Sequence, residues 1–92
     1  MLSVLVGNIK GGCGKTTIAT HLASAFAQRG LKTAIGDCDR QRSALNWLRR
    51  RSDAAPVITG LDWSKEVGDP PKGIERLIID APAAMHLSLI HI

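Results

Sequence analysis

The pattern of apolar positions changes repeatedly along this chain, from continuous runs to a spacing of three or four residues and back. The continuous runs are rich in β-branched residues and predict strands at 2–8, 32–36, 56–60 and 76–80. The spaced positions predict a helix from residue 18 to Arg29, ended by Gly30, and a second helix over 41–51. Apolar strands that alternate with helices favour a parallel sheet buried on both faces. The predicted fold class is therefore α/β, a mostly parallel sheet with flanking helices.

Each predicted helix has one apolar face, which is expected to pack against the sheet. In the first helix this face consists of Ile18, Leu22, Ala25 and Phe26. In the second it consists of Ala44, Leu45 and Leu48, and the five arginines between residues 40 and 51 are expected to point outward. A basic cluster can also contact nucleic-acid phosphates, so direct DNA binding stays open as the weaker alternative to a solvated helix face.

Composition narrows the class of protein further. The chain has 92 residues, 45% of them hydrophobic and 22% charged, with a net charge of +4. This is the balance of a soluble globular domain and excludes a disordered or fibrous chain. No apolar run approaches the ~20 residues of a membrane helix, and no basic leader follows Met1, so we expect a cytoplasmic protein. Cys13 and Cys38 have no metal-ligand or disulfide-framework spacing and are expected to be free thiols.

A glycine-rich segment between the first strand and the first helix carries the strongest chemical signal. Its sequence is KGGCGKTT over residues 10–17. Glycines there let successive main-chain N–H groups turn inward around phosphate oxygens, and the start of the helix adds its positive end. Lys15 is expected to reach the β- and γ-phosphates of a nucleotide, and Thr16 to offer its hydroxyl to Mg²⁺. The alternative is a glycine-rich turn that binds no ligand.

The first half of this segment departs from the usual phosphate-binding loop. Ile9 stands where a glycine is expected, and Lys10 follows it. These residues match the deviant Walker A pattern, and the segment resembles the ParA/MinD family of ATPases. The resemblance implies that Lys10 is the signature lysine, which reaches the nucleotide bound by a partner subunit. A solvated loop lysine is the alternative.

Two predicted strand ends resemble further motifs of the same family. Asp37 and Asp39 stand in the segment DCDRQ, which is similar to Asp-x-Asp-Pro-Gln and implies that Asp39 orients the attacking water near Mg²⁺. Arg40 stands where proline is commoner. The Asp-x-Asp followed by Arg-Gln-Arg is more similar to the MipZ-like branch of the family. Asp80 ends an apolar strand as a Walker B aspartate does and is expected to hold Mg²⁺ mainly through a water. Asp37 is either a site residue or a structural residue bonded to the phosphate loop.

The resemblance also implies ligands, partners and site residues. The cofactors are ATP and Mg²⁺. Two subunits form a homodimer that sandwiches two nucleotides, a ParB-like protein activates hydrolysis, and later parts of the chain contact DNA. Catalytic roles fall on Lys10, Lys15 and Asp39. The nucleotide is bound by Gly11, Gly12, Cys13, Gly14, Lys15, Thr16 and Thr17, and the metal by Thr16, Asp39 and Asp80.

The implied function is an ATP-hydrolysing dimerisation switch used in DNA partition or spatial positioning. We assign residues 1–82 to the N-terminal part of a P-loop ATPase domain, so the chain is expected to be truncated. Residues 83–92 are a tail of doubtful origin, and residues 87–92 resemble translated sequencing-adapter sequence. Two alternatives stay open. One is another deviant Walker A enzyme, such as a nitrogenase-iron-protein-like reductase, a metal-cluster carrier or an amide-forming synthetase; the other is a nucleotide-binding fragment that does not hydrolyse ATP.

Overall fold

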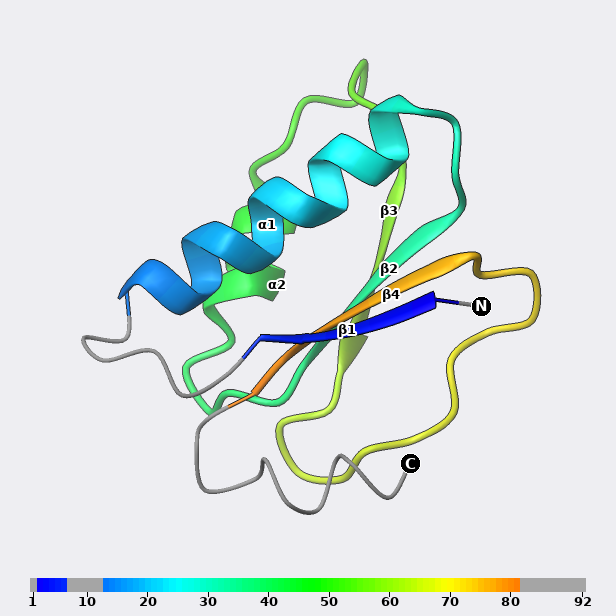
Figure 1. Cartoon of the computed structure of the whole chain (residues 1–92). Helices are drawn as coiled ribbons and strands as arrows, with labels where there is room; N and C mark the ends of the chain where they lie inside the picture. Colours follow the sequence, from blue (N-terminus) through cyan, green and yellow to red (C-terminus); the bar gives the residue numbers. More distant parts are fainter. Residues whose placement is uncertain (1, 7–12, 82–92) are drawn as a thin grey trace.

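The computed structural model describes residues 2–6 and 13–81, and these form alternating strands and helices (Figure 1). In chain order the elements are β1 (Leu2–Val6), α1 (Cys13–Gln28), β2 (Thr33–Asp37), α2 (Ser43–Arg49), β3 (Ile58–Asp62) and β4 (Arg76–Asp80). The types and order of the predicted elements are confirmed. The predicted residues 7–8 of the first strand, Pro82 and the predicted tail of residues 83–92 lie outside the described residues.

The four described strands form one all-parallel sheet in the order β1-β4-β2-β3. The predicted α/β fold class with a parallel sheet is therefore confirmed. The last strand in the sequence, β4, lies between β1 and β2 and pairs with both. All strands run the same way, so their carboxyl ends gather at the edge of the sheet where α1 begins (Figure 1).

Several element boundaries differ from the prediction: β2 runs Thr33–Asp37 rather than 32–36, and α2 ends at Arg49 rather than at residue 51. β3 begins at Ile58 and continues to Asp62, because its register with β2 starts at the pair Thr33–Ile58; the preceding Val57 is 84% exposed. α2 is shorter than predicted at its start, because Arg42 has a φ of 52°, in the left-handed region, and interrupts the helical backbone.

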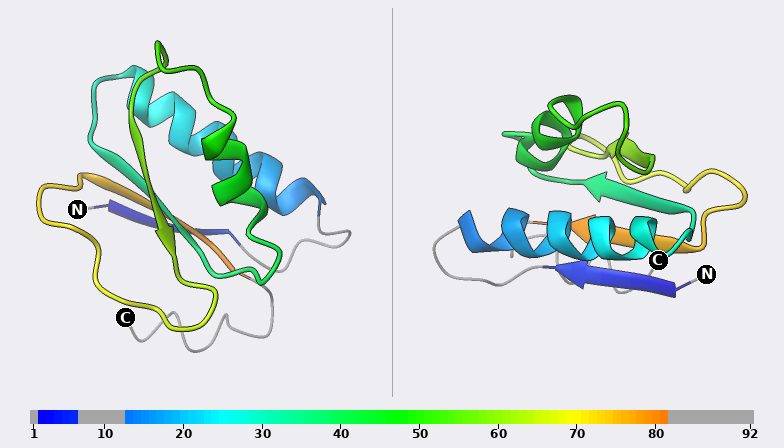
Figure 2. Two further views of the ribbon diagram at one scale, coloured as in Figure 1. Left: turned by 180° about the vertical axis from the view of Figure 1, so that it is seen from behind. Right: turned by 90° about the horizontal axis from the view of Figure 1, so that it is seen from above.

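Both helices cover the same face of the sheet (Figure 2). The core on this face combines buried alanines of α1 with Ile35 and Ile78 from the two central strands. Between residues 16 and 28 of α1, the buried positions are Thr20 and a row of alanines four residues apart, Ala19, Ala23 and Ala27. Small side chains at this spacing let a helix lie close to a sheet.

The apolar stripe predicted for α1 is therefore wrong at two of its four positions. Ile18 is 44% exposed and Ala25 is exposed, whereas Leu22 and Phe26 are half-buried beside the alanine row. The larger side chains flank the helix–sheet contact because the alanines occupy its centre. In α2 the prediction holds better, with Ala44 fully buried and Leu45 and Leu48 half-buried.

The opposite face of the sheet is covered by the connection between β3 and β4 rather than by a described helix (Figure 2). Trp63, which is 6% exposed, packs there with buried Ala34, Leu77 and Ile79, and Val67 and Ile74 pack against the same cluster. The tryptophan lies directly over Gly36 of β2. Trp63 therefore packs between this connection and the sheet.

Replacing Gly36 with alanine is expected to lower the free energy of unfolding by about 2 kcal/mol, the typical cost of overpacking a core. A Cβ at this position would overlap the Trp63 ring at Cε3 and Cζ3, and a buried ring has little room to move. Gly60→Ala is the control, because its Cβ would meet only the flexible ends of Leu45 and Leu48, at 2.8 and 2.9 Å. Urea denaturation followed by circular dichroism compares the two, and equal losses would contradict the role of the ring.

No helix within residues 2–6 and 13–81 combines the length and apolarity needed to cross a bilayer. The longest, α1, has 16 residues.

Candidate functional site

Three aspartates stand side by side at the carboxyl edge of the sheet. The strand register pairs Asp80 of β4 with Asp37 of β2, and Asp37 with Asp62 of β3. Because side chains alternate along a strand, residues in register point to the same face, and here that is the face covered by the helices, where Ile35 and Ile78 also lie. Each aspartate makes a different contact with the start of a helix.

Asp80 contacts the first helix. The Thr16 hydroxyl donates a hydrogen bond of 3.2 Å to Asp80 Oδ2, and Asp80 is fully buried. The main chain holds the strand end in place, since the Cys38 amide donates to the Asp80 carbonyl at 2.9 Å and the Ala81 amide donates to the Val6 carbonyl at 3.1 Å. The structure thus brings together two of the three residues predicted to hold a metal.

The donor set of Thr16 and Asp80 fits Mg²⁺. This ion takes oxygen ligands and is usually bound by one or two carboxylates together with phosphates and water. An alcohol oxygen and a buried carboxylate oxygen meet here at the start of a helix. In the described part of the chain, no three His, Cys, Asp or Glu side chains form a metal cluster.

Helix α1 begins earlier than the sequence pattern predicted, at Cys13 rather than after Thr17. The second half of the glycine-rich segment is therefore the first turn of the helix. The main-chain N–H groups of this turn have no partners within the helix, and the helix dipole makes this end positive, which favours anions. Its first turn contains no acidic residue. The predicted residues Lys10, Gly11 and Gly12 lie outside the described residues, and of Cys13, Gly14 and Lys15 only the backbone is described.

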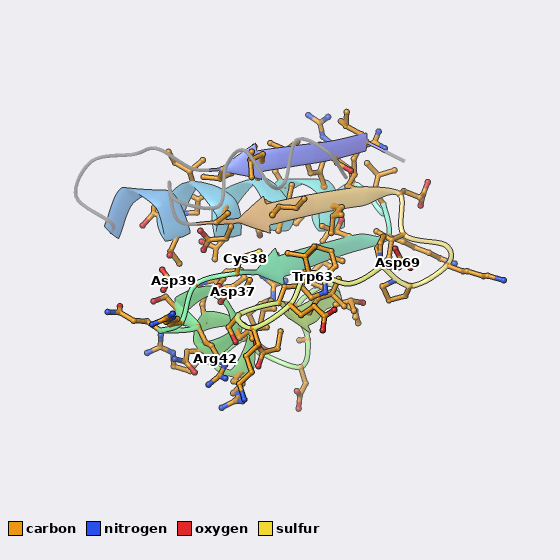
Figure 3. All side chains as sticks on the ribbon, turned by 90° about the horizontal axis from the view of Figure 1, so that it is seen from below. Asp37, Cys38, Asp39, Arg42, Trp63 and Asp69 are labelled. Atoms are coloured by element: carbon orange, nitrogen blue, oxygen red, sulfur yellow. The ribbon has the colours of Figure 1, made fainter. Side chains whose placement is uncertain are left out.

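Asp39 follows β2 and is held by hydrogen bonds of its own turn. Its Oδ1 accepts the Gln41 amide at 3.0 Å, and its carbonyl accepts the Arg42 amide at 3.0 Å. The side chain is half-buried and lies at the end of the sheet where α1 begins (Figure 3). Arg40, which replaces the commoner proline, is exposed and leaves this turn intact. The role of Asp39 in orienting water stays a prediction.

Asp37 is completely buried, and its carboxylate accepts two main-chain amides. Oδ1 accepts from Asp39 at 3.0 Å and Oδ2 from Leu45 in α2 at 3.1 Å. Burial raises the pKa of this carboxyl above its usual 3.8 and exceeds the opposing effect of the two amides; the nearby charges of Asp80 and Asp39 raise the pKa further. The sequence left open whether Asp37 is a site residue or a structural residue bonded to the phosphate loop. The contacts seen here are structural, and their described partners are the amides of Asp39 and of Leu45 in α2.

Asp62 is a residue that the sequence analysis missed, since the third strand was predicted to end at Gly60. Its Oδ1 accepts the Ser64 amide at 3.1 Å and the Ser64 hydroxyl at 2.6 Å, and its Oδ2 lies 2.9 Å from Arg42 Nε. The hydrogen bonds from Ser64, and then the Arg42 charge, lower the pKa of Asp62. The apolar Leu61 is the sequence signal that could have extended the predicted strand beyond Gly60. A strand that continued past Leu61 would have placed Asp62 at the strand end, beside Asp37.

Asp62→Asn is expected to remove a small, pH-dependent part of the stability. Because the pKa of Asp62 is lower in the folded chain than its usual 3.8, its contribution is present above pH 3.8 and is lost as the pH falls through the folded pKa. The effect is small because the side chain is 49% exposed and screened by solvent. Urea denaturation of both proteins at several pH values should show the two stabilities converging in acid. A gap that widens in acid would contradict the assignment.

The five clustered arginines do not form one solvated face. Arg40, Arg49 and Arg50 are exposed, as predicted. Arg42 instead pairs with Asp62, and Arg51 stacks 4.9 Å from the centre of the Trp47 ring and donates to the Pro56 carbonyl at 2.7 Å. Two of the five therefore contact the protein itself, which weakens the interpretation of the cluster as a nucleic-acid surface.

Comparison with known proteins agrees with this geometry. Residues 4–85 match the CobQ/CobB/MinD/ParA nucleotide-binding domain family. The chain is 28% identical over 94 residues to maintenance of carboxysome distribution protein A of Halothiobacillus neapolitanus, covering 95% of this chain and 43% of that protein. It is 42% identical over 73 residues to protein IncC of Escherichia coli, an alignment that covers 79% of this chain and 18% of that protein. It is 33% identical over 69 residues to nitrogenase iron protein 2 of Methanothermococcus thermolithotrophicus, covering 75% of this chain and 23% of that protein.

The chain spans less than half the length of these relatives. No solved structure matches it. The MipZ-like branch suggested by Arg40 stays a prediction. The match to the domain covers most of the chain, and the described part contains an α/β sheet with a hydroxyl–carboxylate pair at the start of the helix that continues the glycine-rich segment. The chain therefore belongs to the CobQ/CobB/MinD/ParA nucleotide-binding domain family.

Proposed function

We propose that the whole protein is an ATP-binding and ATP-hydrolysing dimerisation switch of the ParA/MinD type, used in DNA partition or spatial positioning. The observation that carries the proposal is the contact between Thr16 at the start of α1 and buried Asp80 at the end of β4. In a parallel α/β sheet, ligands bind at the carboxyl ends of the strands. A relative named for carboxysome distribution supports positioning as the class of task.

The proposed division of labour follows from the chemistry of each residue. The amides of the first turn of α1 bind phosphate oxygens, Lys15 neutralises the β- and γ-phosphates, and Thr16 and Asp80 hold Mg²⁺. The metal, when bound, neutralises charge on the phosphates. Asp39 orients the water that attacks the γ-phosphate. Lys10 reaches the nucleotide of the partner subunit, so hydrolysis depends on dimerisation.

Titration with ATP, in the presence and absence of Mg²⁺, tests the central contact. Thr16→Ala is expected to weaken binding about tenfold with Mg²⁺, the cost of one interaction with a charged group, and to have little effect when the metal is chelated. Thr59→Ala is the matched control, because Thr59 is a half-buried threonine on the edge strand β3. Equal affinities of Thr16→Ala and the unaltered protein in Mg²⁺ would overturn the metal role of Thr16.

A second candidate function is a reductase resembling the nitrogenase iron protein. The 33% identity to such a protein over three quarters of this chain supports it. The two functions differ in one requirement: a reductase needs a redox centre, and an ATP-hydrolysing switch does not. An iron–sulfur absorption spectrum from the whole protein would favour the reductase, and its absence after anaerobic purification would favour the switch.

A further inference from the structure

The turn between β2 and α2 lacks the usual start of a helix. The N-cap residue of α2 is Arg42, whose side chain makes no capping hydrogen bond and whose φ of 52° is in the left-handed region. Helices normally begin with Ser, Thr, Asp or Asn, because a side-chain oxygen accepts one of the first N–H groups. The start of α2 must therefore be stabilised from elsewhere.

Asp37 supplies that acceptor from the neighbouring strand end. Its Oδ2 accepts the amide of Leu45, the third residue of α2, at 3.1 Å, which is the bond an N-cap side chain would make. Its Oδ1 accepts the amide of Asp39 at 3.0 Å. One buried carboxylate thus binds both ends of the turn that carries Asp39 (Figure 3).

We propose that Asp37 is a positioning residue for Asp39: its buried carboxylate, bonded to the amides of Asp39 and Leu45, fixes the turn so that the Asp39 side chain is oriented before nucleotide binds. This proposal rests on the role given to Asp39 in the proposed function. Asp39 is then held at three points, by its amide to Asp37, by its carbonyl to Arg42 and by its carboxylate to Gln41.

The positioning role needs both carboxylate oxygens. Asparagine has the same shape but only one accepting oxygen, and its NH₂ group would face an N–H donor. Asp37→Asn therefore loses one of the two bonds without leaving a cavity. The Thr16–Asp80 contact involves neither bond, so the substitution is expected to affect hydrolysis and to leave nucleotide affinity nearly unchanged.

The first part of the test measures the turn itself, without nucleotide. Amide hydrogen exchange followed by NMR is expected to be at least about tenfold faster at Asp39 or Leu45 in Asp37→Asn, since an amide loses a charged acceptor. Asp53→Asn is the control, because it removes the same charge from an exposed residue beyond the end of α2. Unchanged exchange at both amides, or equally faster exchange across the whole sheet, overturns the proposal.

The second part measures turnover by the whole protein. We expect kcat for ATP hydrolysis to fall about tenfold in Asp37→Asn while the Kd for ATP changes less than about threefold. An unchanged kcat, or a kcat and an affinity that fall together, overturns the positioning role. Asp39→Ala distinguishes failure of the positioning role from failure of the proposed function. If Asp39→Ala loses activity while Asp37→Asn does not, the positioning role of Asp37 fails and the proposed function stands. Full activity of Asp39→Ala refutes the role of Asp39, on which the positioning role and the proposed function both depend.

Discussion

Lys15→Ala is expected to lower the affinity of the whole protein for ATP by about 100-fold, equivalent to about 2.7 kcal/mol, the upper range for hydrogen bonds with charged groups. Lys15 stands directly before Thr16, and the backbone there is the first turn of α1. Its ammonium group is the positive charge predicted to neutralise the β- and γ-phosphates. Equilibrium titration with a fluorescent ATP analogue gives both dissociation constants.

Lys72→Ala is the matched control for this substitution. Lys72 is exposed in the connection between β3 and β4, and its replacement with alanine removes the same charge as Lys15→Ala. We expect its ATP affinity to match that of the unaltered protein. Affinities that fall equally in the two variants would show that overall charge, rather than a phosphate-binding lysine, governs binding.

Asp39→Ala is expected to lower the rate of ATP hydrolysis by about 100-fold, the lower end of the range for a residue that positions or deprotonates a nucleophile. The Kd for ATP should change less than about threefold, because phosphate binding is assigned to α1 and the segment before it. Single-turnover hydrolysis of radiolabelled ATP by the whole protein measures the chemical step separately from product release.

An Asp39→Ala protein that hydrolyses ATP at the normal rate would refute the role of this residue. Asp53→Ala provides the comparison, since it removes an exposed carboxylate in the connection between α2 and β3. A loss of ATP affinity in Asp39→Ala, without a change in kcat, would instead place Asp39 among the groups that hold the metal and phosphates.

The fold was predictable where periodicity and local chemistry agree. β4 was predicted to the residue, because its apolar run is bounded by Arg76 and Asp80. The buried face of α1 was predicted incorrectly at Ile18 and Ala25, because the predicted face was centred on Leu22 and Phe26, whereas the row Ala19, Ala23 and Ala27 makes the close contact with the sheet. The shift of β3 depends on pairing with β2, which only the tertiary structure determines.

The candidate site was predictable at the level of motifs and not at the level of contacts. The sequence indicated Thr16 and Asp80 separately, and the structure shows the 3.2 Å contact between them across 64 positions of the chain. No local pattern marks the bond between Asp37 and the Leu45 amide, because a helix cap is normally sought beside the helix start. The left-handed Arg42 is the feature that makes the distant cap necessary.

The placement of β4 determines how the protein can form during synthesis. β1 is translated first, yet the strand it pairs with is completed only at Asp80, and β2 lacks its second neighbour until the same moment. The entropic cost of closing such a long loop must be met before the strand pairing stabilises the sheet, which slows folding. A nascent chain that stops short of Arg76 therefore leaves β1 separated from β2 and β3, with no strand to join them.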